Sequence, residues 1–594
     1  MKKLVVIFLL IVQISSYAQN KGILLEAEGF KNKGGWVVDP QFVEEMGSPY
    51  LLAHGMGVAV ANAKTSFKLK SKGEYHIWVR TKNWVPGEWE APGKFKLKIN
   101  DRLLESELGT KKGWTWQYVG KEYLAKKEHQ IELVDLTGFD GRCDAIYLSK
   151  KNVAPPENAD HLSQWRTKMH HKSKSPKVQK EFDLVVIGGG IAGCAAAIAA
   201  AEKDLKVALI HDRPVLGGNA SSEVRVHTLG IYGHFERIMK MIDTEHYPNG
   251  SKKAYKEDEK RLRNIEKYIN IHLFLNWRAF DAYADNDEIE YVDAKNIISQ
   301  EIVRFKAPLF VDCTGDGWIG YWAKAKYMYG RESSDKFGEA WDKYDELWSP
   351  KKADNRVMGT SLLWNSYKTN TVQDFPEVPW AIAVAKDNEA LEGGWRWEYS
   401  TNDLNQIDDA EQIRDHMLRA IYGSFYNAKQ KEGNENVALE WVSYISGKRE
   451  SRRLVGDHIY TFNDVRTHAQ FPDSVVVETR EIDVHYQQHL KENNKPDFLS
   501  RALFYETEKY YVPYRSLYSK NIENLFMAGR CFSCSHVGLG GPRVMNTTGQ
   551  MGAAVGYAAY LCKKYQASPR DIYMKYLKEY MEIVLNSNKN SFDE

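Results

Sequence analysis

The stretch FDLVVIGGGIAG, residues 182–193, decides how the rest of this chain is interpreted. Residues 183–187 form a short apolar run, as a strand buried on both faces of a parallel sheet does. Gly188, Gly190 and Gly193 follow with the spacing G-x-G-x-x-G, and the alanine-rich residues after them predict a helix. In this context the glycines allow a tight turn, close approach of a pyrophosphate and close helix–strand packing, while the first N–H groups of the helix bind phosphate. The stretch therefore predicts a dinucleotide-binding site.

A second strand is expected at residues 206–210 (KVALI). Asp212 lies two residues beyond it, near the position about 20 residues after the glycines where a carboxylate binds the ribose hydroxyls. We therefore expect Asp212 to contribute to the same dinucleotide site.

Length and charge limit the possible classes of protein. A chain of 594 residues exceeds the size at which one hydrophobic core stops growing, so more than one domain is expected. The formal net charge of +2 gives no indication of a nucleic-acid partner.

The first residues have the pattern of a secretory signal. Residues 1–18 combine two lysines, the apolar run VVIFLLIV and the small residues SSYA. We interpret this segment as a signal peptide, and no later apolar run is long enough for a transmembrane helix. The mature protein is expected to be secreted or periplasmic.

Residues 21–150 predict an antiparallel β-sandwich, because short alternating segments recur between turn signals. The pieces LEAEGF, GEYHIWVR and GRCDAIYL resemble the carbohydrate-binding sandwiches appended to bacterial polysaccharide enzymes. The resemblance implies that Glu26 and Glu28 help to hold a structural Ca²⁺. Two roles stay open for four tryptophans in loop-like stretches, namely stacking on sugar rings or packing between domains; they are Trp84, Trp89, Trp114 and Trp116.

Residues 151–180 are polar, basic and interrupted by prolines, and they predict a linker. Farther along, Cys531 and Cys534 form a C-x-x-C motif, which leaves a thiol–disulfide redox pair open.

The stretch RPVLGGNASSE, residues 213–223, indicates a particular family for the dinucleotide-binding part of the chain. With the preceding glycines it resembles the FAD-dependent oxidoreductase family, glutathione-reductase-like flavoproteins of bacterial carbohydrate loci that are sometimes labelled xanthan lyases. In that family this stretch wraps the FAD diphosphate and ribityl chain, which implies cofactor-binding roles for Arg213, Gly217, Gly218, Asn219 and Ser221. The wider superfamily often has Glu directly after the second strand, where this chain has His211, so the ribose ligand stays open.

Two later motifs continue the same pattern. The residues Cys313 to Gly317 (CTGDG) resemble the return of the chain to the FAD-binding sheet, and residues 511–565 resemble the closing segment with its small-residue helix. Arg530 stands where most of the superfamily has an aspartate that binds a ribityl hydroxyl. The resemblance implies further FAD contacts from Thr314, Gly315, Asp316, Gly529, Arg530 and Gly552.

The expected architecture is multidomain. An N-terminal antiparallel β-sandwich precedes an α/β Rossmann-like FAD-binding domain, residues 181–320 and 511–594, with an inserted α+β substrate domain at residues 321–510.

For catalysis we expect His536 to be the base, because it lies in the loop that the resemblance places near the flavin and because histidine titrates near neutral pH. His227 and His234 are second choices. Arg225 and Arg543 are candidates for holding substrate, since a guanidinium group suits planar bidentate partners.

Three functions remain open from the sequence. The preferred one is an exported FAD enzyme that transfers hydride between a sugar or sugar-derived hydroxyl and flavin N5, acting on a small molecule or an oligosaccharide. The alternatives are a polysaccharide lyase or hydrolase and a non-catalytic glycan-binding protein. The sequence leaves the electron acceptor unknown.

Overall fold

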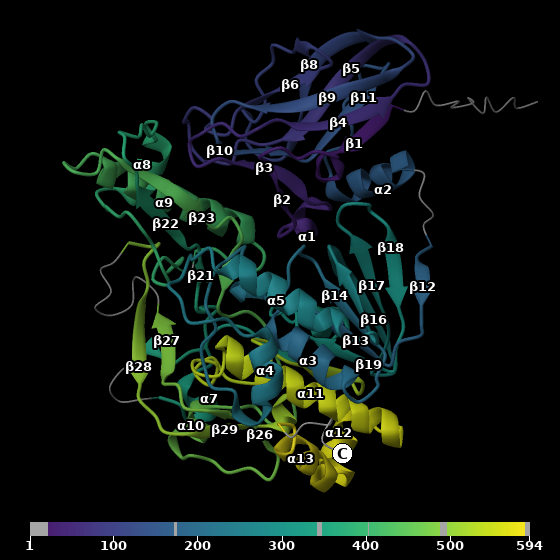
Figure 1. Cartoon of the computed structure of the whole chain (residues 1–594), viewed down its shortest axis with the longest axis vertical. Helices are drawn as coiled ribbons and strands as arrows, with labels where there is room; N and C mark the ends of the chain where they lie inside the picture. The colour runs from purple at the N-terminus through teal and green to yellow at the C-terminus, as the bar shows by residue number, and fades with distance from the viewer. Residues whose placement is uncertain (1–21, 171–174, 341–346, 402, 487–495, 589–594) are drawn as a thin grey trace, which may run out of the picture.

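The computed structural model describes residues 22–170, 175–340, 347–401, 403–486 and 496–588, so the expected signal peptide lies outside the described residues. Figure 1 shows a β-sandwich at one end of the molecule, next to the insert that carries α8 (Pro379–Ala385) and α9 (Ala410–Lys429) and next to the part of the chain that carries a parallel sheet. Within the described residues, no helix combines the length and the apolar content needed to cross a membrane.

The predicted sandwich is present between β1 (Ile23–Glu26) and β11 (Ala145–Ser149). Its sheets have the orders β1-β11-β5-β8, β10-β3-β2 and β4-β9-β6-β7, and all of their strand pairs are antiparallel. Alternating residues such as Ile77, Val79, Leu97 and Leu133 are fully buried or nearly so between the sheets. The remaining elements are β2 (Val37–Asp39), α1 (Val43–Met46), β3 (Tyr50–His54), β4 (Ala63–Lys68), β5 (Gly73–Thr81), β6 (Phe95–Ile99), β7 (Arg102–Leu103), β8 (Thr115–Leu124), β9 (Glu128–Asp135) and β10 (Phe139–Cys143).

The segment predicted to be a linker contains regular structure. Helix α2 (Ala159–His170) packs on the sandwich, and β12 (Lys177–Gln179) pairs in parallel with β18 (Ile302–Phe305). Only Leu162 and Arg166 of α2 are buried. So narrow a buried face produces no apolar period in the sequence, which explains why this helix was not predicted.

The dinucleotide-type domain is built on a parallel five-stranded sheet with the order β15-β14-β13-β19-β30. The strand of the opening motif, β13 (Leu184–Ile187), is central and fully buried on both faces, as its apolar run predicts. Helix α3 (Ile191–Ala201) packs against α11 (Met545–Tyr565), and the two lie side by side below the sheet in Figure 1. The other elements are β14 (Val207–His211), α4 (Glu236–Ile242), α5 (Ala254–Glu266), β15 (Ile271–Leu275), β19 (Leu309–Asp312), α6 (Trp318–Trp322), β30 (Leu525–Met527), α12 (Pro569–Lys575) and α13 (Leu577–Leu585).

An antiparallel meander of β16 (Trp277–Asp285), β17 (Glu288–Asn296) and β18 stands beside this sheet. The insert consists of short two-stranded sheets and helices, as an α+β domain does. Its elements are β20 (Tyr327–Met328), α7 (Ser334–Phe337), β21 (Thr360–Ser361), β22 (Trp364–Lys368), α8 (Pro379–Ala385), α9 (Ala410–Lys429), β23 (Val437–Val442), β24 (Gly447–Lys448), β25 (Arg453–Leu454), α10 (Phe462–Arg466), β26 (Ser474–Glu478), β27 (Ile482–Tyr486), β28 (Arg501–Tyr505) and β29 (Tyr510–Pro513).

The sandwich and the insert share a buried seam. The Trp84 ring lies 5.2 Å from that of Trp380 in α8, and Trp114 donates to a carboxylate oxygen of Glu411 in α9. Trp116 is buried against α2, whereas Trp89 is 42% exposed. Of the two roles considered for these tryptophans, packing between domains therefore applies to Trp84 and Trp114.

Candidate functional site

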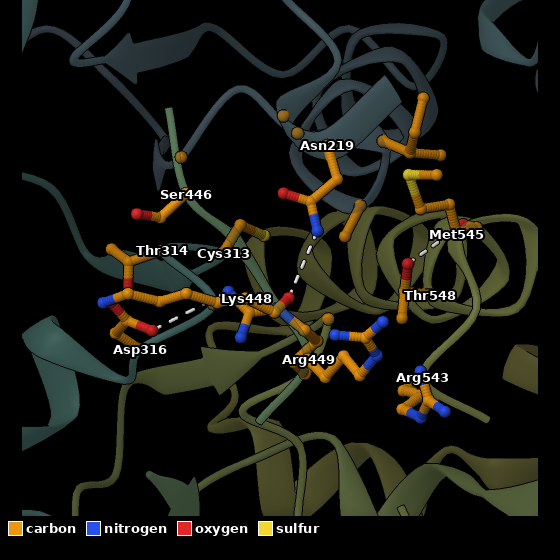
Figure 2. A pocket seen from close by; sticks show the side chains of 18 of the residues that line it. Asn219, Cys313, Thr314, Asp316, Ser446, Lys448, Arg449, Arg543, Met545 and Thr548 are labelled. Carbon is orange, nitrogen blue, oxygen red and sulfur yellow. Dashed lines mark hydrogen bonds and ion pairs between the residues drawn. The ribbon is translucent and has the colours of Figure 1, made fainter. Parts of the chain in front are cut away.

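A cavity of about 460 Å³ opens at the carboxyl ends of β13, β14 and β19 and extends to the start of α11. This edge of a parallel sheet is where open α/β proteins bind ligands. Figure 2 shows residues from the FAD-type domain and from the insert converging on the cavity, among them Asn219, Lys448, Arg449 and Arg543.

The three glycines of the opening motif have different tasks. Gly188 has φ +108°, and a Cβ atom there would lie 2.2 Å from the Cys313 carbonyl oxygen. At Gly193 a Cβ atom would lie 1.8 Å from the Gly188 carbonyl oxygen, so this glycine serves the turn and lies outside the cavity lining. A Cβ atom on Gly190 would meet no protein atom within 4 Å, and Gly190 lines the cavity directly before α3. The open space is therefore in front of the helix N-terminus, where a pyrophosphate is expected.

Asp212 follows β14 directly, because the strand continues through His211. Asp212 lines the cavity and accepts a hydrogen bond from Arg278 Nη1 at 3.0 Å. Burial opposes its ionisation, but the guanidinium groups of Arg213 and Arg278 hold the pKa of Asp212 below its usual value. An ionised carboxylate at this edge suits ribose hydroxyls.

His211 has a structural role instead. Its Nδ1 atom accepts a hydrogen bond from the Gly189 N–H at 3.0 Å, and its Nε2 atom lies 3.0 Å from the Val215 carbonyl oxygen. Burial lowers its pKa to about 4, so the ring is neutral at pH 7 and fixes the glycine turn against the next loop.

The stretch after β14 brings four of its five predicted residues to the cavity: Arg213, Gly217, Gly218 and Asn219. Asn219 Nδ2 donates to the Lys448 carbonyl oxygen at 3.2 Å, which links this stretch to the insert. Ser221 lies outside the lining and donates to the Gly218 carbonyl oxygen, so it shapes the turn.

Thr314, Gly315 and Asp316 line the cavity opposite Arg530 and Lys448. Asp316 accepts a hydrogen bond from Lys448 Nζ at 2.8 Å. Although burial opposes it, the Lys448 and Arg530 charges lower the pKa of Asp316 to about 2. Gly529 lines the cavity as well, whereas Gly552 packs α11 on α3, since a Cβ atom there would lie 2.0 Å from the Ala192 carbonyl oxygen.

These residues fit FAD. Gly190 leaves a space at a helix N-terminus, and α11 begins at Met545 with no side chain capping its first N–H groups. Arg530 Nη1 is buried and has no hydrogen-bond partner among the described residues. An uncapped helix start suits the negative charge of a reduced flavin, and an unpartnered guanidinium N–H suits a polar cofactor group.

The end of the cavity beside α11 carries a group that the sequence analysis did not single out as a unit. His485 Nδ1 lies 2.5 Å from Glu398 Oε2, and His485 Nε2 lies 3.3 Å from Asp483 Oδ1. Arg543 Nη2 donates to Asp483 Oδ2 at 2.9 Å. His485, Asp483 and Arg543 all line the cavity.

A local signal for this group exists in the alternation of β27. Asp483 and His485 share one face of a strand whose other face, Ile482, Val484 and Tyr486, is apolar. The pairing with Glu398, 87 residues away, has no local signature.

Glu398 is held ionised by its neighbours. Burial raises its pKa, but Arg449, 3.3 Å away, and His485 lower it to about 2. Because an ionised carboxylate only accepts, His485 Nδ1 carries a proton, and Nε2 is the ring nitrogen that faces Asp483.

Other expected catalytic residues lie elsewhere. His536 is 2% exposed, lies outside the lining of the main cavity, and directs Nδ1 at Glu450 at 2.9 Å. Arg225 is also outside the lining and stacks on Trp441, with 4.3 Å between its guanidinium carbon and the ring centre. His227 lines the cavity, whereas His234 does not, and burial lowers the pKa of both.

The structure does not support a calcium site at Glu26 and Glu28. Glu26 is paired with Arg166 at 3.3 Å and with His170 at 2.8 Å. Glu28 Oε1 accepts a hydrogen bond from Gln300 Nε2 at 2.8 Å, so this carboxyl group also has a protein partner. Across the described part of the chain, no group of three or more His, Cys, Asp or Glu side chains is arranged to hold a metal ion.

Cys531 and Cys534 are free thiols that contribute to different hydrophobic clusters. Burial raises the pKa of both well above the usual value, which opposes formation of the reactive thiolate.

The fold and the cavity together define a dinucleotide-binding protein of the flavoprotein type. The profile of the family described as FAD dependent oxidoreductase matches residues 183–581. The chain belongs to this family and is an FAD-dependent oxidoreductase.

Individual relatives are distant. An iron–sulfur subunit of the CoB–CoM heterodisulfide reductase from Methanopyrus kandleri is 23% identical over 138 residues, which are 23% of this chain and 20% of that protein. The chain thus spans about a fifth of the length of this curated relative.

Among solved structures, a geranylgeranyl bacteriochlorophyll reductase-like protein from Thermoplasma acidophilum is similar at 12% identity and a TM-score of 0.33, covering 68% of this chain and 83% of that one. A family 35 carbohydrate binding module from Clostridium thermocellum is similar at 17% identity and a TM-score of 0.18, covering 21% of this chain and 97% of that one.

Proposed function

We propose that this protein oxidises, or in the reverse direction reduces, a sugar or sugar-derived hydroxyl in polysaccharide metabolism, with FAD as the hydride carrier. When bound, the flavin accepts or donates a hydride at N5. The observation that carries the proposal is the continuity of one cavity from Gly190 and Asp212 to His485 and Arg543. Such a cavity offers a cofactor site and a proton-transfer group in a single space.

His485 is suited to accept the hydroxyl proton of an alcohol. Glu398 holds the ring with its proton on Nδ1, so Nε2 is the accepting atom. Asp483 lies 3.3 Å from Nε2 and stabilises the imidazolium that forms. This arrangement repeats the physical logic of a histidine base oriented by a carboxylate.

The surroundings of His485 suit a polyhydroxylated ring. Trp395 and Phe504 supply aromatic surface beside Arg396 and Arg543 in the same lining. Aromatic faces pack on the apolar face of a pyranose, while guanidinium groups bind its hydroxyl or carboxylate groups. The free edge of Arg543, whose Nε is buried without a partner among the described residues, is available for such a contact.

Export is proposed from residues 1–18, which have the pattern of a signal peptide. Amino-terminal sequencing of protein from fractionated cells tests the export: processing after Ala18 supports it, and an intact Met1 in the cytoplasm contradicts it.

The test of the activity is anaerobic flavin bleaching against a panel of neutral sugars, uronic acids and oligosaccharides. Loss of the oxidised flavin absorbance with one sugar, and a ketone or aldehyde product, supports the proposal. A flavin that is reduced by dithionite but by no sugar contradicts the assigned substrate class, and release of an unsaturated sugar instead indicates lyase chemistry.

A further inference from the structure

The N-terminal sandwich contributes directly to the lining of the cavity. Gln41 and Phe42, in the loop between β2 and α1, line it although they precede the glycine motif by more than 140 residues. The Phe42 side chain is 4% exposed, so the ring is held in place by its surroundings.

Arg278 fixes this loop beside Asp212. Its Nη1 atom donates to Asp212 Oδ2 at 3.0 Å and to the Pro40 carbonyl oxygen at 3.2 Å. Its Nε and Nη2 atoms donate to the two carboxylate oxygens of Glu44 at 3.0 and 2.5 Å. One guanidinium group therefore joins both ends of residues 40–44 to the expected ribose carboxylate.

Ser446 supplies a second, independent observation on the same side of the cavity, which residues 40–44 and Ser446 form and which we call the wall. The side chain of Gln41 donates to the Tyr444 carbonyl oxygen at 2.9 Å and accepts from the Ser446 N–H at 2.7 Å. Ser446 lines the cavity and is 8% exposed, yet its hydroxyl has no hydrogen-bond partner among the described residues. A buried unpartnered hydroxyl costs free energy unless a bound molecule satisfies it.

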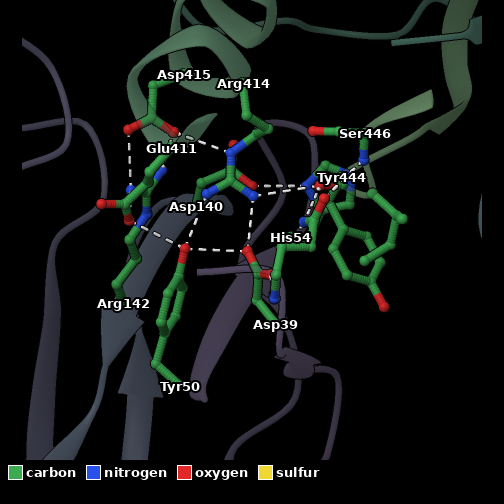
Figure 3. A network of polar contacts seen from close by, with 12 residues as sticks. Asp39, Tyr50, His54, Asp140, Arg142, Glu411, Arg414, Asp415, Tyr444 and Ser446 are labelled. Atoms are coloured by element: carbon green, nitrogen blue, oxygen red, sulfur yellow. Dashed lines mark hydrogen bonds and ion pairs between the residues drawn. The ribbon is translucent and has the colours of Figure 1, made fainter. Parts of the chain in front are cut away.

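The wall is fixed by a buried ion network between the sandwich and α9 (Figure 3). Arg142 contacts Glu411 at 2.7 Å and Asp415 at 2.5 Å, and Arg414 contacts Asp39 at 2.7 Å. Both arginine side chains are 0% exposed. The network fixes the position of residues 40–44 relative to the insert, so this side of the cavity is formed before a ligand binds.

We infer that residues 40–44 of the sandwich, together with Ser446, bind the adenosine end of FAD. The sandwich is then part of the cofactor site and not an appended module that acts alone. The inference rests on FAD binding by the chain, and its ligand is the adenine ring with its ribose. Phe42 offers the ring an apolar contact, and Ser446 offers a hydroxyl to the nucleoside.

The experiment uses the full mature chain freed of flavin and titrated calorimetrically with FAD and with ADP. Phe42→Ala and Ser446→Ala test the wall. Phe67→Ala is the matched control, since Phe67 is 6% exposed in the sandwich core and does not line the cavity. Ser446→Ala removes a hydroxyl that bonds no described protein group, so it tests the wall without breaking a contact within the protein.

Phe42→Ala is expected to raise Kd for FAD about tenfold, and Ser446→Ala about threefold to tenfold. The same two factors are expected for ADP, because ADP shares with FAD only the adenosine diphosphate. Phe67→Ala should leave the Kd values for FAD and for ADP within about twofold of the wild type. The inference is overturned if both wall variants bind FAD like the wild type, if FAD binding weakens while ADP binding does not, or if Phe67→Ala weakens binding as much as Phe42→Ala. Failure of the wild type to bind any FAD would remove the cofactor itself, a result distinct from these.

Discussion

The Nδ1 atom of His211 accepts a hydrogen bond from the N–H of Gly189 at 3.0 Å, so the second strand holds the glycine turn through a neutral imidazole. Because burial lowers its pKa to about 4, the folded chain binds fewer protons at this site than the unfolded chain, whose histidine titrates near 6.5. The neutral His211 ring therefore contributes its full share to the free energy of unfolding above about pH 6.5, and this contribution is lost as the pH falls toward about 4.

We therefore expect the stability advantage of the wild type over His211→Gln to shrink by up to about 3 kcal/mol between pH 7 and pH 4. Urea unfolding of both proteins at several pH values measures this difference. Carboxyl groups also make stability depend on pH, but both proteins contain the same carboxyl groups, so their contributions cancel in the difference. An advantage that stays constant with pH would show that His211 does not titrate as described.

His485→Gln is expected to slow reduction of the bound flavin by sugar substrate about 10²-fold to 10⁴-fold, because it removes the proton acceptor. FAD affinity should change little, and stopped-flow absorbance measures the rate. His536→Gln is the comparison, since His536 contacts Glu450 outside the main cavity lining. If the rate falls with His536→Gln and not with His485→Gln, the base predicted from sequence is the acting one and the present assignment fails.

Arg142→Met is expected to lower the free energy of unfolding by about 3 kcal/mol, because it removes the guanidinium group that bridges the buried Glu411 and Asp415 carboxylates and leaves them only Lys82 and Arg414. Urea unfolding followed by circular dichroism measures the difference. Arg102→Met is the control, since its side chain is 73% exposed and its pair with Glu122 contributes less than about 1 kcal/mol. Equal effects of the two substitutions would refute a stabilising seam.

The six cysteines of the chain are all buried free thiols, so a thiol reagent at pH 7.5 should label none of them rapidly in the native protein and all six after denaturation. Cys531→Ala combined with Cys534→Ala should leave flavin reduction within about twofold of the wild type. Rapid labelling of two thiols, together with loss of flavin reduction in the double variant, would instead support a redox pair.

The strand, glycine turn and helix at residues 183–201 could be predicted because the information is local, with an apolar run, three spaced glycines and a helix-forming alanine segment. The sandwich was predictable for the same reason, since alternation along each strand reports its buried face. These elements bring Gly188, Gly190 and Asp212 to one cavity.

The proton-transfer group could not be predicted in this way. His485 meets Glu398 across 87 residues, and the loop with Phe42 meets Arg278 and Ser446 across more than 230 residues, so neither juxtaposition leaves a period or a spacing in the sequence. His536 lies in a motif of the closing segment, but the local fold turns its ring toward Glu450. The family resemblance identified the cofactor domain, whereas the candidate base was identified only from a side-chain contact between two distant parts of the insert.

The central claim, that the FAD diphosphate lies against Gly190 at the start of α3, is tested most directly by the flavin content of the wild type and of Gly190→Val. Gly190 has φ −69° and open space around a Cβ atom, so valine fits the protein but fills the phosphate position. Reconstituted with excess FAD, the wild type should hold about one FAD per chain, whereas a Gly190→Val protein of unchanged circular dichroism should hold less than about a tenth of that. A wild type that takes up no flavin, or a valine variant that retains its full content, would contradict the account.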